Sequence, residues 1–145
     1  MVRAMTQAGI TPQQQEALLA AARTARLRAY APYSKYRVGA ALLDELGHIH
    51  AGCNVENAAY PQGVCAEAGA ISAMVLAGGQ RVQAVAVVGA SDTWVTPCGG
   101  CRQKLREFCG PDVPILSASA EQVGPSHTLE QLLPESFGPN HLESA

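Results

Sequence analysis

Three cysteines and a glutamate stand at spacings that suit a metal centre with an acid/base group beside it. Cys65 and Glu67 are two residues apart, and Cys98 and Cys101 form a C-x-x-C pair further along the chain. A catalytic zinc site uses three protein ligands and keeps its fourth position for water. A carboxylate near the metal that does not bind it can take and return protons. The pattern therefore predicts one Zn²⁺ held by the three thiolates, with Glu67 as the proton carrier.

The combination of these residues is more specific than any part of it. A C-x-x-C pair alone also occurs in redox proteins and structural zinc sites, but those readings leave Cys65 and Glu67 without a role. A C-x-E or H-x-E segment followed by P-C-x-x-C, as at 97–101, is the known signature of zinc-dependent base deaminases. We expect Cys53 and Cys109 to pack in the core. Partly exposed polar side chains, not ligands, are expected at His48, His50, His127 and His141.

Length and composition favour a single globular domain over residues 1–145. Hydrophobic residues make up 48% of the chain, and 10 basic against 12 acidic residues give a formal net charge of −2. The basic residues are scattered, which argues against a nucleic-acid partner. No apolar run reaches the roughly 18 residues of a membrane span, and residues 1–10 lack the apolar region of a signal peptide. These features, with an odd number of cysteines, predict a cytoplasmic protein with no membrane partner.

The elements that must position the cysteines alternate between strands and helices. We expect strands at 37–43, 48–53, 82–90 and 113–116, and helices at 12–30, 65–76, 99–108 and 128–133, the first capped by Thr11 with Pro12 at its first position. The apolar run at 82–90 is typical of a strand buried on both faces. Such an order predicts a layered α/β domain in which helices cover a central sheet. Two helix N-termini at one edge of this sheet would bring the three thiols together.

Several further motifs extend the pattern over nearly the whole chain. They lie at 31–36, 38–43, 52–60, 65–67, 97–103, 130–134 and 137–139. Through them the chain resembles the small, homotetrameric type of cytidine deaminase. The resemblance implies a three-layer α/β/α fold with a central mixed sheet of about five strands. It also implies one Zn²⁺ per subunit, a small nucleoside as substrate, and active sites shared between the subunits of a homotetramer.

The resemblance also implies roles for individual residues. Cys65, Cys98 and Cys101 would bind zinc, and Glu67 would carry the proton. Asn54 and Glu56 match residues that hydrogen-bond the 3′-hydroxyl of the sugar, and such polar groups disfavour a ligand that leaves them unpaired. The remaining substrate contacts would come from the Ala66 backbone and from three aromatic residues, Tyr36, Tyr60 and Phe137. The last of these would reach into a neighbouring subunit's site and stack on the base.

One position departs from the family's pattern. Many members have an arginine directly after the catalytic glutamate, where it bonds a zinc-bound sulfur, but Ala68 stands there in this chain. Three thiolates around a divalent ion leave a net negative centre. We expect the helix N-termini at Cys65 and Cys98 to supply part of the compensation. Arg102 matches a second family arginine that bonds these sulfurs, and we expect it to supply the rest.

The predicted reaction is hydrolytic deamination of cytidine or deoxycytidine to uridine or deoxyuridine, with release of ammonia, in pyrimidine salvage. Two related deaminases remain as alternatives, one acting on a blasticidin-type antibiotic and one on a base in nucleic acid. The Asn54 and Glu56 pair argues against both. A third alternative is a non-enzymatic binding module stabilised by zinc. It predicts that replacing Glu67 leaves the protein's function intact.

Overall fold

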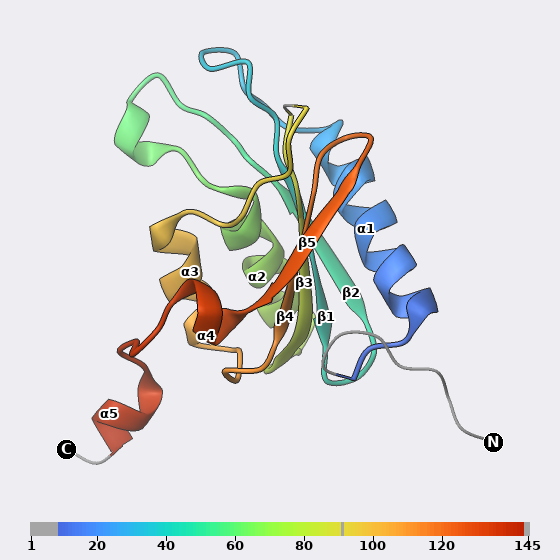
Figure 1. Ribbon diagram of the computed structural model, residues 1–145. Coiled ribbons are helices and arrows are strands. Elements are labelled where there is room, and N and C mark those ends of the chain that lie inside the picture. Colours follow the sequence, from blue (N-terminus) through green and yellow to red (C-terminus); the bar gives the residue numbers. More distant parts are fainter. Residues whose placement is uncertain (1–8, 91, 144–145) are drawn as a thin grey trace.

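Five strands form one mixed sheet in the order β2-β1-β3-β4-β5 in the computed structural model, which describes residues 9–90 and 92–143 (Figure 1). β1 lies antiparallel to β2 and β3, β3 is parallel to β4, and β4 is antiparallel to β5. The strand bounds are β1 (Gly39–Asp44), β2 (Ile49–Cys53), β3 (Val82–Val88), β4 (Pro114–Ala118) and β5 (Val123–Thr128). The predicted mixed α/β sheet is confirmed. The prediction that residues 1–10 contain no signal peptide falls mostly on residues 1–8, which lie outside the described residues.

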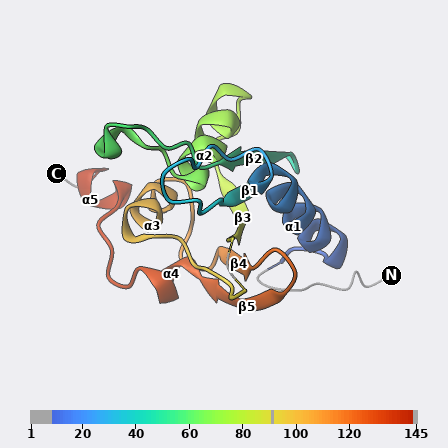
Figure 2. The same cartoon turned by 90° about the horizontal axis from the view of Figure 1, so that it is seen from above.

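Helices cover both faces of the sheet. Seen from above, α1 lies on one face, and α2 and α3 lie on the other, which gives three layers (Figure 2). The helical elements are α1 (Pro12–Arg26), the 3-10 turn η1 (Tyr60–Gln62), α2 (Ala66–Leu76), α3 (Gly99–Arg106), α4 (Leu129–Leu132) and α5 (Pro139–Glu143). Thr11 caps α1 through a capping box with Gln14, as the Thr-Pro start of this helix predicts.

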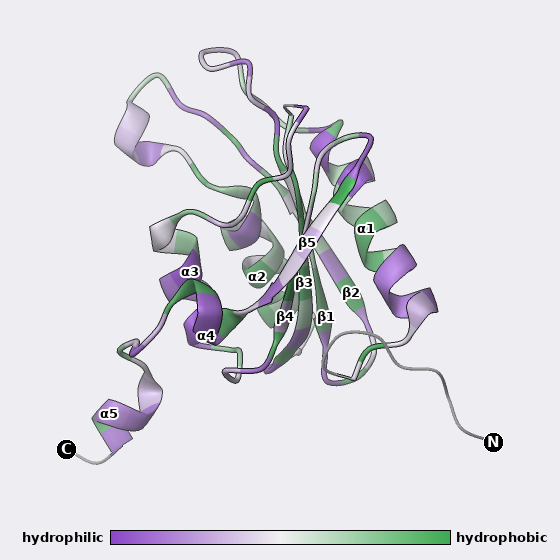
Figure 3. Cartoon of the chain, viewed as in Figure 1, coloured by the Kyte–Doolittle hydropathy of each residue, from purple (hydrophilic) through white to green (hydrophobic). Residues whose placement is uncertain are grey.

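The core is divided by the sheet into two halves, because side chains alternate along each strand. On β1, Ala40 and Leu42 face α2, whereas Ala41 and Leu43 face α1. All of β1 and nearly all of β3 are buried, so the central strands carry apolar residues on both faces (Figure 3). This double burial gives the sheet a fixed position against the helices that hold the site.

Glycines let two helices approach the sheet closely. A Cβ atom added at Gly39 of β1 would lie 2.0 Å from the carbonyl oxygen of Ala22 in α1. One added at Gly52 of β2 would lie 2.4 Å from the carbonyl oxygen of Ala66 and 2.4 Å from the amide nitrogen of Ala70, both in α2. The backbone of α2 therefore rests directly on an edge strand, without an intervening side chain.

Three parts of the chain differ from the sequence-based expectation. α1 ends at Arg26, not near residue 30, because the Tyr30 backbone leaves the helix and bonds Asn54 and Glu56. β5 is an additional edge strand in a segment for which the sequence predicts irregular structure, and its partly exposed, weakly apolar residues give little strand signal. α5 follows Gly138 in a tail that was expected to be broken, with Pro139 at its first helical position.

Within residues 9–90 and 92–143, none of the helices is both long enough and apolar enough to span a bilayer.

Candidate metal centre and substrate site

The three predicted thiols come together at one edge of the sheet. Cys65 is the N-cap of α2, Cys98 is the N-cap of α3, and Cys101 lies in the first turn of α3. Their Sγ atoms all lie within 4.8 Å of one another. This convergence agrees with the sequence-based expectation that two helix N-termini meet at one sheet edge.

The donor set fits one zinc ion. Burial raises the pKa of the Cys65 and Cys101 thiols, whereas a hydrogen bond from the Cys101 backbone lowers the pKa of Cys98. Backbone N–H groups at the starts of α2 and α3 favour negative charge at these sulfurs. Three thiols at this separation suit a tetrahedral zinc that keeps one position for water. Binding of the cation would displace the thiol protons.

Glu67 is buried beside the thiols, with 4% of the residue exposed. Burial raises the pKa of its carboxyl above the ordinary 4.5, although its own backbone N–H, the Cys101 thiol and the charge of Lys104 act in the opposite direction. A carboxyl with a raised pKa holds a proton more readily near neutral pH, as a group that must both accept and return protons requires.

Asn54 and Glu56 each fix a loop segment near the site. The Oδ1 atom of Asn54 accepts a hydrogen bond from the Val38 N–H at 2.8 Å, and its Nδ2 donates to the Tyr36 carbonyl at 2.8 Å. The Oε1 atom of Glu56 accepts from the N–H groups of Tyr33 at 2.9 Å and Ser34 at 3.1 Å. These bonds tie the loop before β1 to the loop after β2.

The Ser34 hydroxyl completes the contacts of Glu56, and this contact was not predicted from the sequence. Ser34 donates through its Oγ to the Oε2 atom of Glu56. This hydrogen bond lowers the pKa of the Glu56 carboxyl, which is therefore ionised at neutral pH. Since serine is common in loops, nothing in the sequence distinguishes this hydroxyl as a partner of the carboxylate.

An open cleft of about 350 Å³ lies beside Glu56. Its lining includes Tyr33, Ser34, Glu56, Asn57, Tyr60 and Gly63. The rings of Tyr33 and Tyr60 meet edge to face with their centroids 5.8 Å apart, and Tyr60 is largely exposed. The hydroxyl of Tyr36 lies 2.8 Å from the position that a Cβ atom would take at Gly89, at the end of β3. These polar and aromatic groups thus lie on the loops before β1 and after β2.

Comparison with known proteins gives the family. The family model described as the cytidine and deoxycytidylate deaminase zinc-binding region matches residues 12–117. The chain belongs to this family. A cytidine deaminase of Sporosarcina psychrophila is 42% identical over 130 residues, which cover 90% of this chain and 96% of that protein.

Solved structures of deaminases share the fold. The crystal structure of cytidine deaminase from Burkholderia pseudomallei has a TM-score of 0.79 and 40% identity, and the match covers 84% of this chain and 98% of that one. The corresponding structure from Mycobacterium tuberculosis has a TM-score of 0.76 and 38% identity, with coverage of 86% and 97%. The five-stranded α/β architecture is therefore that of the cytidine deaminase family.

In this member of the family, Arg102 contacts oxygen atoms and not sulfur. Its Nε donates to the Pro97 carbonyl at 2.7 Å, its Nη2 to the Thr96 hydroxyl at 2.9 Å, and its Nη1 to the Leu132 carbonyl at 2.8 Å. The expected bond to a zinc-ligand sulfur is not among the contacts that the described residues make. All three nitrogens of the guanidinium are already engaged with oxygen, and their targets are the turn before Cys98 and the end of α4.

The C-terminal tail, residues 132–143, lies on the outer side of α3 (Figure 1). Gln103 donates through its Nε2 to the Phe137 carbonyl at 2.9 Å. Phe137 is 58% exposed as a residue, and its ring stacks on the His141 ring with the centroids 5.2 Å apart. The structure therefore places Phe137 on the surface of the chain.

The histidines and the two remaining cysteines divide between confirmed and corrected expectations. His50 and His127 are half-buried and His141 is exposed, which agrees with the expectation of partly exposed side chains, although the His50 side chain also bonds the buried carboxylate of Asp44. His48 is exposed. Cys109 is buried as predicted, and burial raises the pKa of its thiol to about 12, but Cys53 is only half-buried.

Proposed function

We propose that this single-domain chain catalyses the zinc-dependent hydrolytic deamination of cytidine and deoxycytidine, giving uridine or deoxyuridine and ammonia. The observation that carries this proposal is the buried carboxylate of Glu67 beside three converging thiols. Membership of the deaminase family supports the same chemistry. Glu67 stands two residues after Cys65 in the first turn of α2, so it reaches the centre without supplying a ligand.

Cys65, Cys98 and Cys101 would hold the zinc ion. Bound there, zinc would lower the pKa of a water molecule from about 16 towards neutrality. Glu67 would accept one proton from this water and deliver it to the ring nitrogen beside the amine-bearing carbon, while the water oxygen forms a bond to that carbon. The same carboxylate would then take the remaining proton of the added hydroxyl and pass it to the amine. The carbon–nitrogen bond breaks, ammonia leaves, and the carbon keeps the oxygen as the carbonyl of uridine. A raised pKa suits both steps, because the carboxyl must hold the proton between them.

The hydrogen bonds of Asn54 and Glu56 leave one donor and one acceptor for the sugar. The Nδ2 of Asn54 has two hydrogens, of which the Tyr36 carbonyl takes one. The Oε1 of Glu56 already accepts two hydrogen bonds, whereas its Oε2 accepts one from Ser34. A hydroxyl both donates and accepts, so the 3′-hydroxyl of a nucleoside matches what remains on this pair.

The base would lie between the Ala66 backbone and aromatic side chains. Ala66 is buried at the start of α2, directly between Cys65 and Glu67. Tyr36 is held in place because Asn54 bonds its carbonyl oxygen, and we assign it to packing against the pyrimidine. Tyr60 lines the cleft beside Glu56, where it would contact the substrate. No residue on this side is assigned to the 2′-position, so both sugar types are included in the proposal.

A homotetramer with shared sites is supported by two exposed features. α2 is apolar nearly all round, and Val75 and Leu76 on it are exposed, which is typical of a helix that is covered in an assembly. Phe137 points outward in its own subunit, as a residue that stacks on a base in a neighbour's site must do. We infer that four copies assemble, each with one zinc ion. A role in cytoplasmic pyrimidine salvage fits a nucleoside substrate.

The proposal is tested by measuring ammonia release from cytidine, deoxycytidine, cytosine, a blasticidin-type antibiotic and single-stranded DNA. Zinc content and mass in solution are determined on the same preparation. We expect turnover of the two nucleosides and about one zinc per chain. Turnover of the antibiotic or of DNA without turnover of cytidine would contradict the substrate assignment. A zinc-loaded protein that deaminates nothing would favour a binding module.

A further inference from the structure

Three side chains of α3 hold the C-terminal tail, and together we name them the α3 clasp: Arg102, Gln103 and Arg106. Arg102 bonds the Leu132 carbonyl, and Gln103 bonds the Phe137 carbonyl. Arg106 donates through its Nε to the Ser136 hydroxyl at 2.9 Å and through its Nη2 to the Asn140 side chain at 2.8 Å. The clasp thus bonds the residues before and after Phe137 as well as the backbone carbonyl of Phe137 itself.

The tail backbone at Gly138 packs directly against the guanidinium of Arg106. A Cβ atom added at Gly138 would lie 2.3 Å from the Cζ atom of Arg106 and 2.5 Å from its two terminal nitrogens. Only a glycine lets the backbone come this close to the guanidinium. Beyond this contact, the Gly138 N–H lies 3.0 Å from the Nδ1 of His141, whose ring stacks on Phe137. The Phe137 ring is therefore stacked on His141, while the backbone directly after it lies against Arg106.

The clasp also joins the tail to the metal centre. Arg102 bonds Pro97 and Thr96 directly before Cys98, and the same guanidinium bonds Leu132 at the end of α4. α3 itself begins at the C-x-x-C turn. One short helix thus carries two of the thiols at its start and the tail along its outer side. Phe137 is exposed, yet its backbone is hydrogen-bonded to α3, the same helix that carries Cys98 and Cys101.

We propose that the α3 clasp positions Phe137 for the active site of a neighbouring subunit, and that Arg106 is the positioning residue that sets the tail on both sides of the ring. The proposal rests on the assignment of Phe137 to base stacking under the proposed function. An aromatic ring that is already ordered loses less conformational freedom when it stacks on a substrate. Arg106 touches neither substrate nor metal in this scheme, so its effect should pass entirely through Phe137.

The experiment is a double-mutant cycle on the zinc-loaded enzyme, with kcat and KM for cytidine measured for each variant. Phe137→Ala should raise KM about tenfold, the order expected for loss of one stacked ring. Arg106→Ala should raise KM about three- to tenfold with kcat changed less than about twofold, because the loss is of binding that is shared by ground and transition states. In the Phe137→Ala background, Arg106→Ala should add almost nothing.

Two further variants separate positioning from a general loss of structure. Gly138→Ala keeps Arg106 but pushes its guanidinium away, and it should raise KM in the same direction. Arg23→Ala on α1, on the opposite face of the sheet, should leave both constants unchanged. Zinc content, Tm and mass in solution are measured for every variant. We expect zinc content and mass to stay at the wild-type values in Arg106→Ala.

The outcomes distinguish failure of the clasp from failure of the stacking assignment. If Phe137→Ala raises KM while Arg106→Ala and Gly138→Ala do not, the clasp proposal is overturned and the stacking role stands. Multiplicative effects in the double variant also overturn it, since Arg106 would then act by another route. If Phe137→Ala has wild-type kinetics, both proposals are overturned. Deamination by the zinc centre and Glu67 would be unaffected by that result.

Discussion

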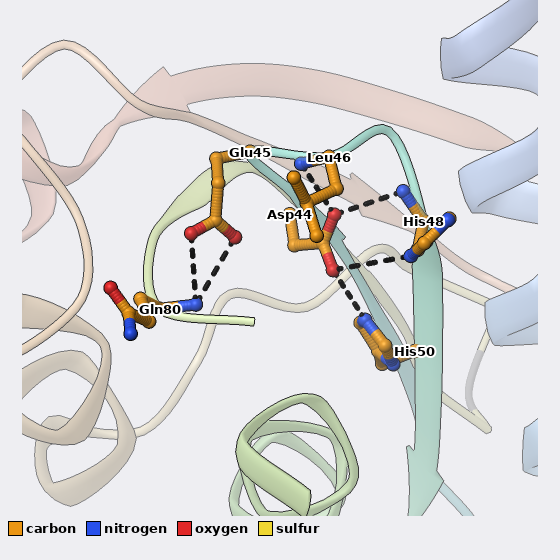
Figure 4. Close-up of polar contacts among 6 residues, drawn as sticks. All are labelled: Asp44, Glu45, Leu46, His48, His50 and Gln80. Carbon is orange, nitrogen blue, oxygen red and sulfur yellow. Dashed lines mark hydrogen bonds and ion pairs between the residues drawn. The ribbon is translucent and has the colours of Figure 1, made fainter. Parts of the chain in front are cut away.

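The buried Asp44 and the half-buried His50 form a hydrogen-bonded pair beside the turn of the β1–β2 hairpin, with 2.7 Å between the Oδ2 of Asp44 and the Nε2 of His50 (Figure 4). The Oδ1 of the same carboxylate accepts from the N–H groups of Leu46 at 2.8 Å and His48 at 2.9 Å. Only 1% of Asp44 is exposed. A single carboxylate therefore organises the turn that connects the two strands.

Replacing Asp44 by asparagine should destabilise the protein at neutral pH and weaken its response to acid. Burial alone would raise the pKa of Asp44, but hydrogen bonds from His50, His48 and Leu46 bring it below the ordinary 3.8. An acid whose pKa is lowered by folding contributes stability above its unfolded value, and this stability is lost as the pH falls through the lower, folded value. We expect Asp44→Asn to reduce the free energy of unfolding at pH 7 by about 1–3 kcal/mol.

Urea unfolding at pH 7 and at pH 3 checks this prediction. The difference between wild type and Asp44→Asn should shrink at pH 3, where the wild-type carboxylate begins to lose its advantage. Asp112→Asn, at an exposed position in the loop before β4, serves as the matched control and should change neither value. An equal destabilisation at both pH values would show that the charge of Asp44 is not what matters.

Removing Cys101 should abolish zinc binding, whereas removing another buried cysteine should not. Cys101 is one of the three converging thiols. Cys109 is equally buried, but it lies elsewhere and its raised pKa, about 12, keeps its thiol protonated. We expect zinc to fall from about one per chain to near zero in Cys101→Ala, because two ligands rarely suffice. Metal analysis after dialysis makes the measurement, and retention of zinc by Cys101→Ala or its loss from Cys109→Ala would contradict the assignment.

Glu67→Gln should remove activity without harming the fold. Loss of a positioned acid/base group is expected to lower kcat for cytidine by roughly a hundredfold or more. Because burial raises the pKa of Glu67, its ionised form is disfavoured in the folded protein, so a neutral glutamine should leave the Tm unchanged or higher. Steady-state kinetics, a melting curve and zinc content are measured together. A lower Tm accompanied by loss of zinc would assign Glu67 a structural role instead.

Arg102→Ala should destabilise the turn at residues 96–98, which leads into the C-x-x-C pair. Its guanidinium supplies donors to the Pro97 and Leu132 carbonyls, and we expect the free energy of unfolding to fall by about 1–2 kcal/mol when they are lost. The Arg102→Ala variant should also lose its zinc to a competing chelator faster than the wild-type protein does. Arg102→Lys should restore little, since an ammonium cannot reproduce the fork of a guanidinium over three acceptors. Full recovery in Arg102→Lys would mean that only the positive charge near the sulfurs matters.

The metal centre and the central strands could be predicted from sequence because their signals are local. Cys65 and Cys98 each stand directly before a helix, and this placement sets where the thiols lie once the helices pack on one face. The apolar run of β3 indicates a strand buried on both faces without reference to any other element. Glu67 follows from its spacing to Cys65.

Features that depend on distant partners could not be predicted in the same way. β5 is polar and becomes a strand only because β4 offers it a partner. Arg102 lies beside the metal turn as expected, but the carbonyl of Leu132 reaches it from a segment thirty residues away in sequence. His50 is bonded by Asp44 on the neighbouring strand. In each case the deciding contact is tertiary, and no local periodicity reports it.

Because α2 packs directly against Gly52, the absence of a side chain at this position affects the geometry of the candidate site. A methyl group at that position would meet the carbonyl of Ala66 and the amide of Ala70, and would lift the start of the helix away from β2. Cys65 and Glu67 would move with it, while Cys98 and Cys101 stayed on α3. The position of Glu67 relative to the thiols of α3 thus depends on a residue that has no side chain. A survey of inactivating substitutions should therefore include Gly52, although this residue takes part in no chemical step.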